Sequence, residues 1–284
     1  MTAAPRRSIA PSSVFAPMLF KGTTAIVTGA GSGIGKATAI GFAALGANVV
    51  LAGRSKDTLE SAAADIEALG SQAVSVPTDI RDASACEALG NAAIEAFGEY
   101  HHVVNNAGGQ FMADPFHISD NGWRSVIDLN LNGTWNMCNR LLPHLMEHGR
   151  GSVVNVVHIF SLDRGAPLFA HSGAARAGVI NLTKSLASYA EGANVTVNAV
   201  APGAILTERS AANYGMTDEQ VRALQSRSMV GDANDIANTI LFLASPAGRM
   251  INGASIVADA SESLQNWPLL DTALDGCASQ RKGA

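Results

Sequence analysis

Four glycines, at positions 29, 31, 33 and 35, have the spacing in this sequence that points most directly to chemistry. They follow the apolar run 25–27 and open a segment of helical periodicity, so a strand, a glycine loop and a helix occur in order. Glycine lets the chain turn tightly and lets backbone N–H groups approach a pyrophosphate at the positive end of a helix. The loop 28–35 therefore predicts dinucleotide binding. Its candidate contact residues are Gly29, Ser32, Gly33, Ile34 and Gly35.

The end of the second predicted strand, residues 51–55, bears on which dinucleotide binds. An NAD site usually places an acidic residue there to accept from the ribose 2′-hydroxyl. This chain has Gly53 and Arg54 instead. With glycine at position 53, the carboxylate that would repel a 2′-phosphate is missing. The guanidinium of Arg54 could bind that phosphate and stack on adenine. The pair favours NADPH over NADH; the alternatives are NADH itself and a solvated surface role for Arg54.

The elements that would position these residues alternate between short apolar runs and helical stretches. Helical periodicity covers 35–45, 57–69 and 83–97, and the apolar runs are 25–27, 48–51, 73–76, 102–104, 152–157, 195–200 and 254–257. Strands that are apolar along their length are typical of parallel sheets covered on both faces. We therefore expect a single α/β domain, a doubly wound Rossmann-type fold with a seven-stranded parallel sheet.

Three segments fall outside this alternation. Residues 1–19 hold three of the ten prolines and are expected to be an arm or a disordered tail. The Rossmann-type domain is expected to span 20–260, with residues 204–231 forming a long insertion that we interpret as a substrate lid. Residues 261–284 form a C-terminal tail that is expected to pack on a neighbouring subunit or to fray.

Composition excludes several classes of function. The 284 residues carry a formal charge of −5 and 47% hydrophobic residues, which fits a folded domain and gives no basic surface for nucleic acid. The three cysteines are too few and too far apart for a disulfide framework or a C-x-x-C metal site, and no metal is expected. No stretch is long and apolar enough to span a bilayer, so no membrane partner and a cytoplasmic location are expected.

Several motifs in order resemble the short-chain dehydrogenase/reductase family. They are the loop 28–35, Asp79, the segment 105–108, Asn130 in 130–133, Pro202-Gly203 and Thr207. The resemblance implies that Asp79 and Ile80 hold adenine, and that Asn106 and Gly108, with Ala107 between them, border the adenosine ribose. It implies that Pro202, Gly203 and Thr207 meet the nicotinamide carboxamide. It also implies a homotetramer or homodimer.

Residues 105–111 and 171–178 resemble one branch of that family more narrowly. The branch holds peroxisomal trans-2-enoyl-CoA reductases and bacterial citronellol dehydrogenase-like proteins. This resemblance implies a small-molecule substrate that is lipophilic or an acyl thioester, and in particular a 2-enoyl thioester whose C=C bond is reduced.

The family's Tyr-x-x-x-Lys pair, in which lysine lowers the tyrosine pKa, is missing from this chain. None of its tyrosines, at 100, 189 and 214, stands four residues before a lysine. Counting from Asn155 puts His171 at the tyrosine and His158 at the catalytic serine. Counting back from Ala177 puts Ser172 at the tyrosine and Arg176 at the lysine. A third reading, one helical turn later, keeps only Lys184.

The candidate catalytic residues are accordingly Asn130, His158, His171 and Arg176. Each histidine could donate a proton near neutral pH or could merely pack. Arg176 could orient the nicotinamide ribose or be a surface charge, and Asn130 could support a water chain or only satisfy a kinked helix. The leading hypothesis is an NADPH-dependent reductase of 2-enoyl thioesters. An alcohol/carbonyl oxidoreductase and a nucleotide-binding non-enzyme are the alternatives.

Overall fold

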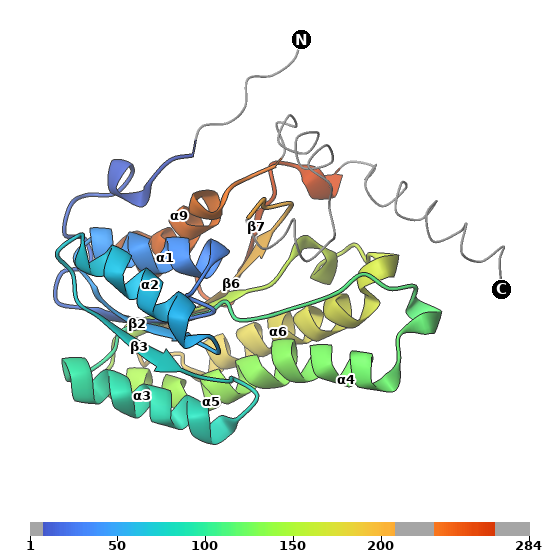
Figure 1. Ribbon diagram of the computed structural model, residues 1–284, viewed down its shortest axis with the longest axis horizontal. Helices are drawn as coiled ribbons and strands as arrows, with labels where there is room; N and C mark the ends of the chain where they lie inside the picture. Colours follow the sequence, from blue (N-terminus) through green and yellow to red (C-terminus); the bar gives the residue numbers. More distant parts are fainter. Residues whose placement is uncertain (1–7, 208–229, 265–284) are drawn as a thin grey trace, which may run out of the picture.

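The computed structural model describes residues 8–207 and 230–264, and its centre is one parallel sheet of seven strands (Figure 1). The strand order is β3-β2-β1-β4-β5-β6-β7. The strands are β1 (Thr24–Thr28), β2 (Asn48–Gly53), β3 (Ala73–Pro77), β4 (His102–Asn105), β5 (Gly151–Val156), β6 (Val195–Pro202) and β7 (Ser255–Ala258). All seven predicted strands are present, so the predicted single Rossmann-type domain is confirmed.

Helices cover both faces of the sheet (Figure 1). On one face lie α1 (Gly33–Ala44), α2 (Lys56–Glu67) and α9 (Ala233–Ala244). On the other lie α3 (Ala83–Phe97), α4 (Asp120–Ile127), α5 (Gly133–Glu147) and α6 (Ala170–Tyr189). A π-helical turn, Asp128–Asn132, joins α4 to α5. Single 3-10 turns are η1 (Pro11–Ser13), η2 (Pro115–His117), η4 (Ile159–Ser161), η5 (Pro167–Phe169), η6 (Pro246–Gly248) and η7 (Glu262–Leu264).

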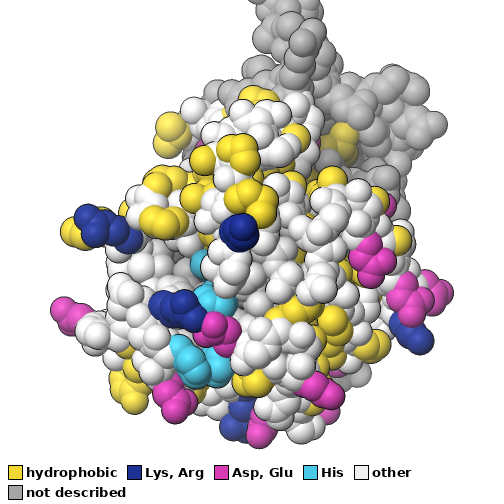
Figure 2. All heavy atoms as spheres, turned by 90° about the vertical axis from the view of Figure 1, so that its left-hand side faces the viewer, with side chains coloured by type: hydrophobic (Ala, Val, Ile, Leu, Met, Phe, Trp, Pro, Cys, Tyr) yellow, Lys and Arg dark blue, Asp and Glu magenta, His cyan; other side chains and the backbone are white. Residues whose placement is uncertain are grey.

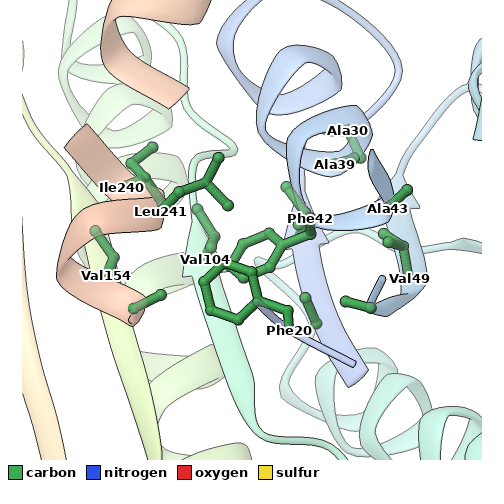
Figure 3. Packing of buried hydrophobic residues seen from close by; sticks show 14 of the residues in the cluster. Phe20, Ala30, Ala39, Phe42, Ala43, Val49, Val104, Val154, Ile240 and Leu241 are labelled. Atoms are coloured by element: carbon green, nitrogen blue, oxygen red, sulfur yellow. The ribbon is translucent and has the colours of Figure 1, made fainter. Parts of the chain in front are cut away.

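Two apolar cores hold the layers together. Between the sheet and the α1 and α9 helices, Phe42 and Ile240 pack with Phe20 against Val104 (Figure 3). Between the sheet and the α3 and α5 helices, Leu89, Met137 and Leu141 form the second core. Burial of such side chains stabilises a fold by roughly 1.5–3 kcal/mol each. Because helices cover both faces of the sheet, side chains on both sides of its central strands are buried, and those strands are therefore apolar along their length.

The strand order reverses between β1 and β4, which are neighbours although β2 and β3 lie between them in sequence. At such a switch point the loops after adjacent strands leave toward opposite faces and open a crevice at the carboxyl edge. The loop 28–35 follows β1 and residues 106–109 follow β4. The topology therefore brings the predicted cofactor residues to one place.

The predicted arm, 1–19, is ordered where it is described. Pro11 is buried, and the side-chain amides of Asn234 and Asn238 donate to Ser8 Oγ at 2.9 Å and to the Ile9 carbonyl at 3.0 Å. These contacts tie the arm to α9. Most of the predicted lid, 204–231, and most of the predicted tail, 261–284, lie outside the described residues. Within the described residues no helix is long and apolar enough to cross a membrane.

Candidate active site

The glycine loop after β1 has a shape that side chains would block. Gly29 and Gly33 have φ angles of +64° and +54°, in the left-handed region that glycine enters without strain. A Cβ on Gly35 would overlap the Gly29 carbonyl and lie 2.5 Å from the side-chain nitrogen of Asn106. The loop thus presents backbone to the start of α1, the arrangement that receives a pyrophosphate. The residues present fit a dinucleotide.

Asn106, at the end of β4, braces this loop. Its Nδ2 donates to the Thr28 carbonyl at 2.9 Å, and Thr28 Oγ1 accepts from the backbone N–H groups of Asn106 and Ala107, each at 2.9 Å. The Asn106 side chain is therefore engaged in supporting the scaffold. The backbone of Ala107 and Gly108 remains the part of this segment placed along the crevice.

The predicted adenine residues follow β3. Arg81 holds the Asp79 carboxylate through Nε, at 2.9 Å, and through a second guanidinium nitrogen at 2.5 Å. The Arg81 hydrogen bond is the largest reason why the pKa of Asp79 is lowered, and the charge of Arg54 lowers it further. Arg54 thus lies near Asp79, as an adenosine site would require. The Ile80 side chain is buried against Gly133, so its side chain serves the core.

Asn130 lies in the π-helical turn and is buried. Its Nδ2 donates to the carbonyls of Gly109 and Val126, both at 2.8 Å, and its Oδ1 accepts from the Gly109 N–H at 3.2 Å. Its own carbonyl accepts from Thr134 Oγ1 at 2.8 Å. Asn130 therefore fixes the loop after β4 to the π-helical turn, which is one of the two roles considered for it from the sequence. The other, a role in a water chain, stays a prediction.

Arg176 projects from α6 toward the crevice. One guanidinium nitrogen donates to the Val156 carbonyl at 2.5 Å, and the other lies where a Cβ on Gly108 would stand. Glycine at 108 is required by this contact. The guanidinium is thereby held between the end of β5 and the loop after β4, where a fixed cation could contact a ribose.

His158, Ser172 and Gln110 form one hydrogen-bonded group. Ser172 Oγ donates to Gln110 Oε1 at 2.6 Å and lies 3.0 Å from His158 Nε2. A hydroxyl has one proton, and Ser172 gives it to Gln110, so the network assigns the donor in the second bond to His158 Nε2–H. Burial, followed by the charge of Arg176, lowers the pKa of His158 to about 3. His158 is therefore neutral at physiological pH.

The other candidates lie apart from this group. His171 is fully buried and packs edge-on against Phe111, with ring centroids 4.4 Å apart, and burial lowers its pKa. Within the described residues no hydrogen bond joins His171 to Ser172, and a catalytic role for His171 stays a prediction. Lys184 is exposed on α6. Asn155 is buried and bonds Asn105 at 2.8 Å and Thr183 at 2.9 Å, so its side chain links β4, β5 and α6.

The segment after β6 approaches the glycine loop. A Cβ on Gly33 would lie 3.3 Å from Thr207 Cγ2, and the Gly203 N–H donates to the Ala258 carbonyl at 3.2 Å. Pro202, Gly203 and Thr207 thus reach the same edge of the sheet as the other cofactor candidates. The sequence analysis did not single out two residues that make contacts in this region of the structure, Gln110 and Glu262. Gln110 stands inside the segment 105–111, but only its contact with Ser172 shows that it joins the polar group.

Histidines also gather on the surface at the amino edge of the sheet, opposite the carboxyl edge where the cofactor candidates lie. Acidic and basic side chains lie beside them (Figure 2). His144 and His148 have ring centroids 4.0 Å apart, and Glu99 accepts from Arg150 at 2.5 Å. Within the residues that the structure describes, no group of three or more ligands could hold a metal ion.

Comparison with known proteins decides the family. A family model described as enoyl-(acyl carrier protein) reductase matches residues 29–260, and a short-chain type dehydrogenase/reductase of Sinorhizobium fredii is 34% identical over 84% of this chain and 96% of its own length. The chain belongs to the short-chain dehydrogenase/reductase family. Members of this family are oxidoreductases that use NAD or NADP, which agrees with the dinucleotide binding predicted from the glycine loop.

Two further similarities within the short-chain dehydrogenase/reductase family concern named activities. A probable 2,4-dienoyl-CoA reductase of Bacillus subtilis is 32% identical over 86% of this chain and 97% of its own length. The solved structure of a citronellol catabolism dehydrogenase, AtuB, of Pseudomonas aeruginosa has a TM-score of 0.77 and 37% identity, covering 88% of this chain and 98% of that one. The predicted resemblance to the family is confirmed.

Proposed function

We propose that this chain is an NADPH-dependent reductase of the C=C bond of a 2-enoyl thioester. The observation that carries the proposal is the position of Ser172, four residues before Arg176 on α6, where the family's tyrosine and lysine stand by one count of the sequence. Ser172 is fully buried and its hydroxyl proton is already given to Gln110. Among the described residues, position 172 therefore offers a serine hydroxyl and no phenol to serve as an acid.

The absence of that acid distinguishes two reactions. Reduction of a ketone places a full negative charge on one oxygen, which must take a proton from a nearby acid. Reduction of an enoyl thioester adds hydride at the β-carbon and spreads the charge over an enolate, which fixed hydrogen-bond donors stabilise. The α-carbon then takes its proton from water. This second reaction needs no phenol.

The residues of the site divide the remaining work. When bound, NADPH supplies the hydride. Arg176 would hold the ribose as a fixed cation, because its guanidinium is anchored on the Val156 carbonyl. Asn130 would keep the loop at Gly109 in place. His158 would act as a neutral hydrogen-bonding group, since burial and the charge of Arg176 lower its pKa to about 3 and so favour the neutral ring near neutral pH.

Two relatives support an acyl-thioester or other lipophilic substrate. One is named as a probable 2,4-dienoyl-CoA reductase and the other as a citronellol catabolism dehydrogenase. Apolar side chains at the rim of the site also fit a lipophilic substrate, because Phe111 and Met112 are partly exposed beside Gln110.

The preference for NADPH rests on Arg54 at the end of β2. It stands next to the start of α2, where Ser55 is the N-cap and, in the described structure, makes no side-chain capping bond. A guanidinium, a hydroxyl and a helix N-terminus at one place suit a 2′-phosphate. We expect Arg54→Ala to weaken NADPH binding roughly 10- to 100-fold and to leave NADH binding unchanged. Arg124→Ala, which removes an exposed arginine on α4, is the matched control.

The reaction is tested by following NADPH absorbance with three substrate panels: 2-enoyl-CoA thioesters, ketones and aldehydes. Oxidation of NADPH with the enoyl thioesters is expected. Turnover confined to ketones or aldehydes would replace the proposal by the alcohol/carbonyl alternative. Fluorescence titration of NADPH runs in parallel, and binding without turnover on any panel would make the chain a nucleotide-binding non-enzyme.

We also propose that the chain acts in the cytoplasm as a homodimer or homotetramer. Trp123 on α4 and Trp135 on α5 are 42% and 44% exposed, which is a large apolar surface for helices that are otherwise packed. Size-exclusion chromatography with light scattering tests this assembly, and a monomer would contradict it.

A further inference from the structure

A buried carboxylate lies near the end of the described chain. Glu262, the first residue of η7, is 3% exposed, and its Oε2 accepts from the backbone N–H of Ala204 at 2.5 Å. Burying a carboxylate is costly unless hydrogen bonds compensate it. Ala204 lies just beyond β6, so this bond joins the end of β7 to the segment 202–207.

The contact is close enough to dictate the residue type opposite. A Cβ on Gly203 would lie 2.5 Å from Glu262 Oε2 and 2.7 Å from Asp259 Cβ. Only glycine lets the two strands' ends approach in this way. Gly203 and Ala204 therefore lie in direct contact with Asp259 and Glu262.

The turn that delivers Glu262 is strained. Ala260 and Ser261 have φ angles of 50° and 72°, a region that residues with a side chain rarely enter. The Asp259 carboxylate holds the turn by accepting from the N–H groups of Ser261 at 3.0 Å and Ser263 at 2.7 Å. Strain of this kind persists where surrounding contacts fix it, and it concentrates at functional sites.

The other end of the segment 202–207 is also held. Thr207 lies against Gly33 of the glycine loop, and Ile205 pairs with Gly231. The segment is thus fixed at its start by Glu262 and at its end by the cofactor loop itself. A displacement at Ala204 would be passed to whatever the segment contacts.

We propose that Glu262 is a positioning residue for the nicotinamide half of the cofactor, acting through Gly203 and Ala204. The inference rests on the proposed function and on the prediction, drawn from the family resemblance, that the segment 202–207 contacts the nicotinamide. The adenosine half binds at Arg54 and Asp79, at the other side of the switch point. Loss of Glu262 is therefore expected to weaken contacts to one half only.

The test compares two ligands in the full chain. NADPH contains both halves, whereas 2′,5′-ADP contains only the adenosine half with its 2′-phosphate. Glu262→Ala is expected to raise the Kd of NADPH about 10-fold, the loss of one well-placed hydrogen bond, while the Kd of 2′,5′-ADP stays the same. Glu262→Gln keeps an acceptor for the Ala204 N–H and should restore most of the NADPH affinity. Glu191→Ala, which removes an exposed carboxylate just after α6, is the control.

Two outcomes overturn the inference. Equal affinities of Glu262→Ala and wild type for NADPH would show that the contact has no bearing on the cofactor. An equal loss for NADPH and 2′,5′-ADP would show a general structural role. If Glu262→Ala fails to fold, Glu262→Asp, whose carboxylate is one carbon shorter, takes its place with the same expectation. If the wild type binds NADH and not NADPH, the cofactor proposal is wrong, and the comparison is made with NADH and ADP.

Discussion

Nε2 of His158 lies 3.0 Å from Oγ of Ser172, and this bond joins the end of β5 to the first turn of α6. Because Ser172 Oγ donates its hydrogen bond to Gln110 Oε1, the network assigns the Nε2–H tautomer to His158. By the counts made from the sequence, His158 takes the place of the family's catalytic serine, and Ser172 takes the place of its tyrosine. Its protonation and its orientation are therefore the properties to test.

Ser172→Ala removes the middle member of this group. His158 and Gln110 would lose their common partner, so we expect kcat for the best enoyl thioester to fall about 10-fold, as for one lost hydrogen bond. Steady-state kinetics measures the effect. Ser185→Ala is the control on the same helix, because Ser185 is exposed and its Oγ donates to the Asn181 carbonyl. Equal kcat for Ser172→Ala and wild type would remove Ser172 from the mechanism.

The pH profile reports the charge of His158. Its pKa of about 3 means that the ring stays neutral from pH 5 to pH 9. We expect the profile of kcat against pH to have the same shape in wild type and in His158→Gln, with a lower height in the variant. A limb with an apparent pKa between 5 and 8 that vanishes in the variant would show that His158 is instead a titrating acid.

His102 links stability to pH. It is buried between Phe20 and Phe42, and burial lowers its pKa to about 3 from the usual 6.5. Below pH 6.5 the unfolded chain binds a proton that the folded chain does not, so stability falls as pH falls toward 3.

His102→Phe removes this term. Between pH 7 and pH 5 the wild type should lose about 2 kcal/mol more unfolding free energy than the variant, at roughly 1.4 kcal/mol per pH unit. Urea unfolding at the two pH values measures the difference. His117→Phe, at an exposed histidine, should keep the wild-type pH dependence. Parallel pH dependences for wild type and His102→Phe would refute the assignment.

Gly108→Ala tests the seat of Arg176. The new Cβ would overlap the guanidinium and lie 2.7 Å from Asn130 Oδ1, so Arg176 must move. We expect kcat/KM to fall roughly 10- to 100-fold, the cost of misplacing one binding group. Gly165→Ala is the matched control, because no atom lies within 4 Å of the added carbon. Retention of full activity by Gly108→Ala would show that the position of Arg176 does not matter.

Local patterns carried much of the prediction. The helix predicted at 83–97 has those bounds in the structure, and α1 begins at Gly33, two residues before the predicted start. The difference arises because the first helical turn is already closed before residue 35: the Ser32 carbonyl accepts from the Lys36 N–H at 3.2 Å, and Gly33 takes a positive φ there. Such boundaries depend on backbone geometry that residue types do not specify. The existence of an element depends on periodicity, which a single sequence displays.

The sequence by itself determined the glycine loop, the parallel sheet and the absence of a tyrosine four residues before a lysine, because each depends on residue type and short spacing. Only the tertiary structure decided that Ser172, rather than His171, meets His158, because neighbouring helix positions point in different directions and the choice depends on how α6 packs. Only the tertiary structure brought Gln110 to Ser172 and Glu262 to Ala204. These partners are distant in sequence, and the crossovers of a doubly wound sheet bring them together at its carboxyl edge.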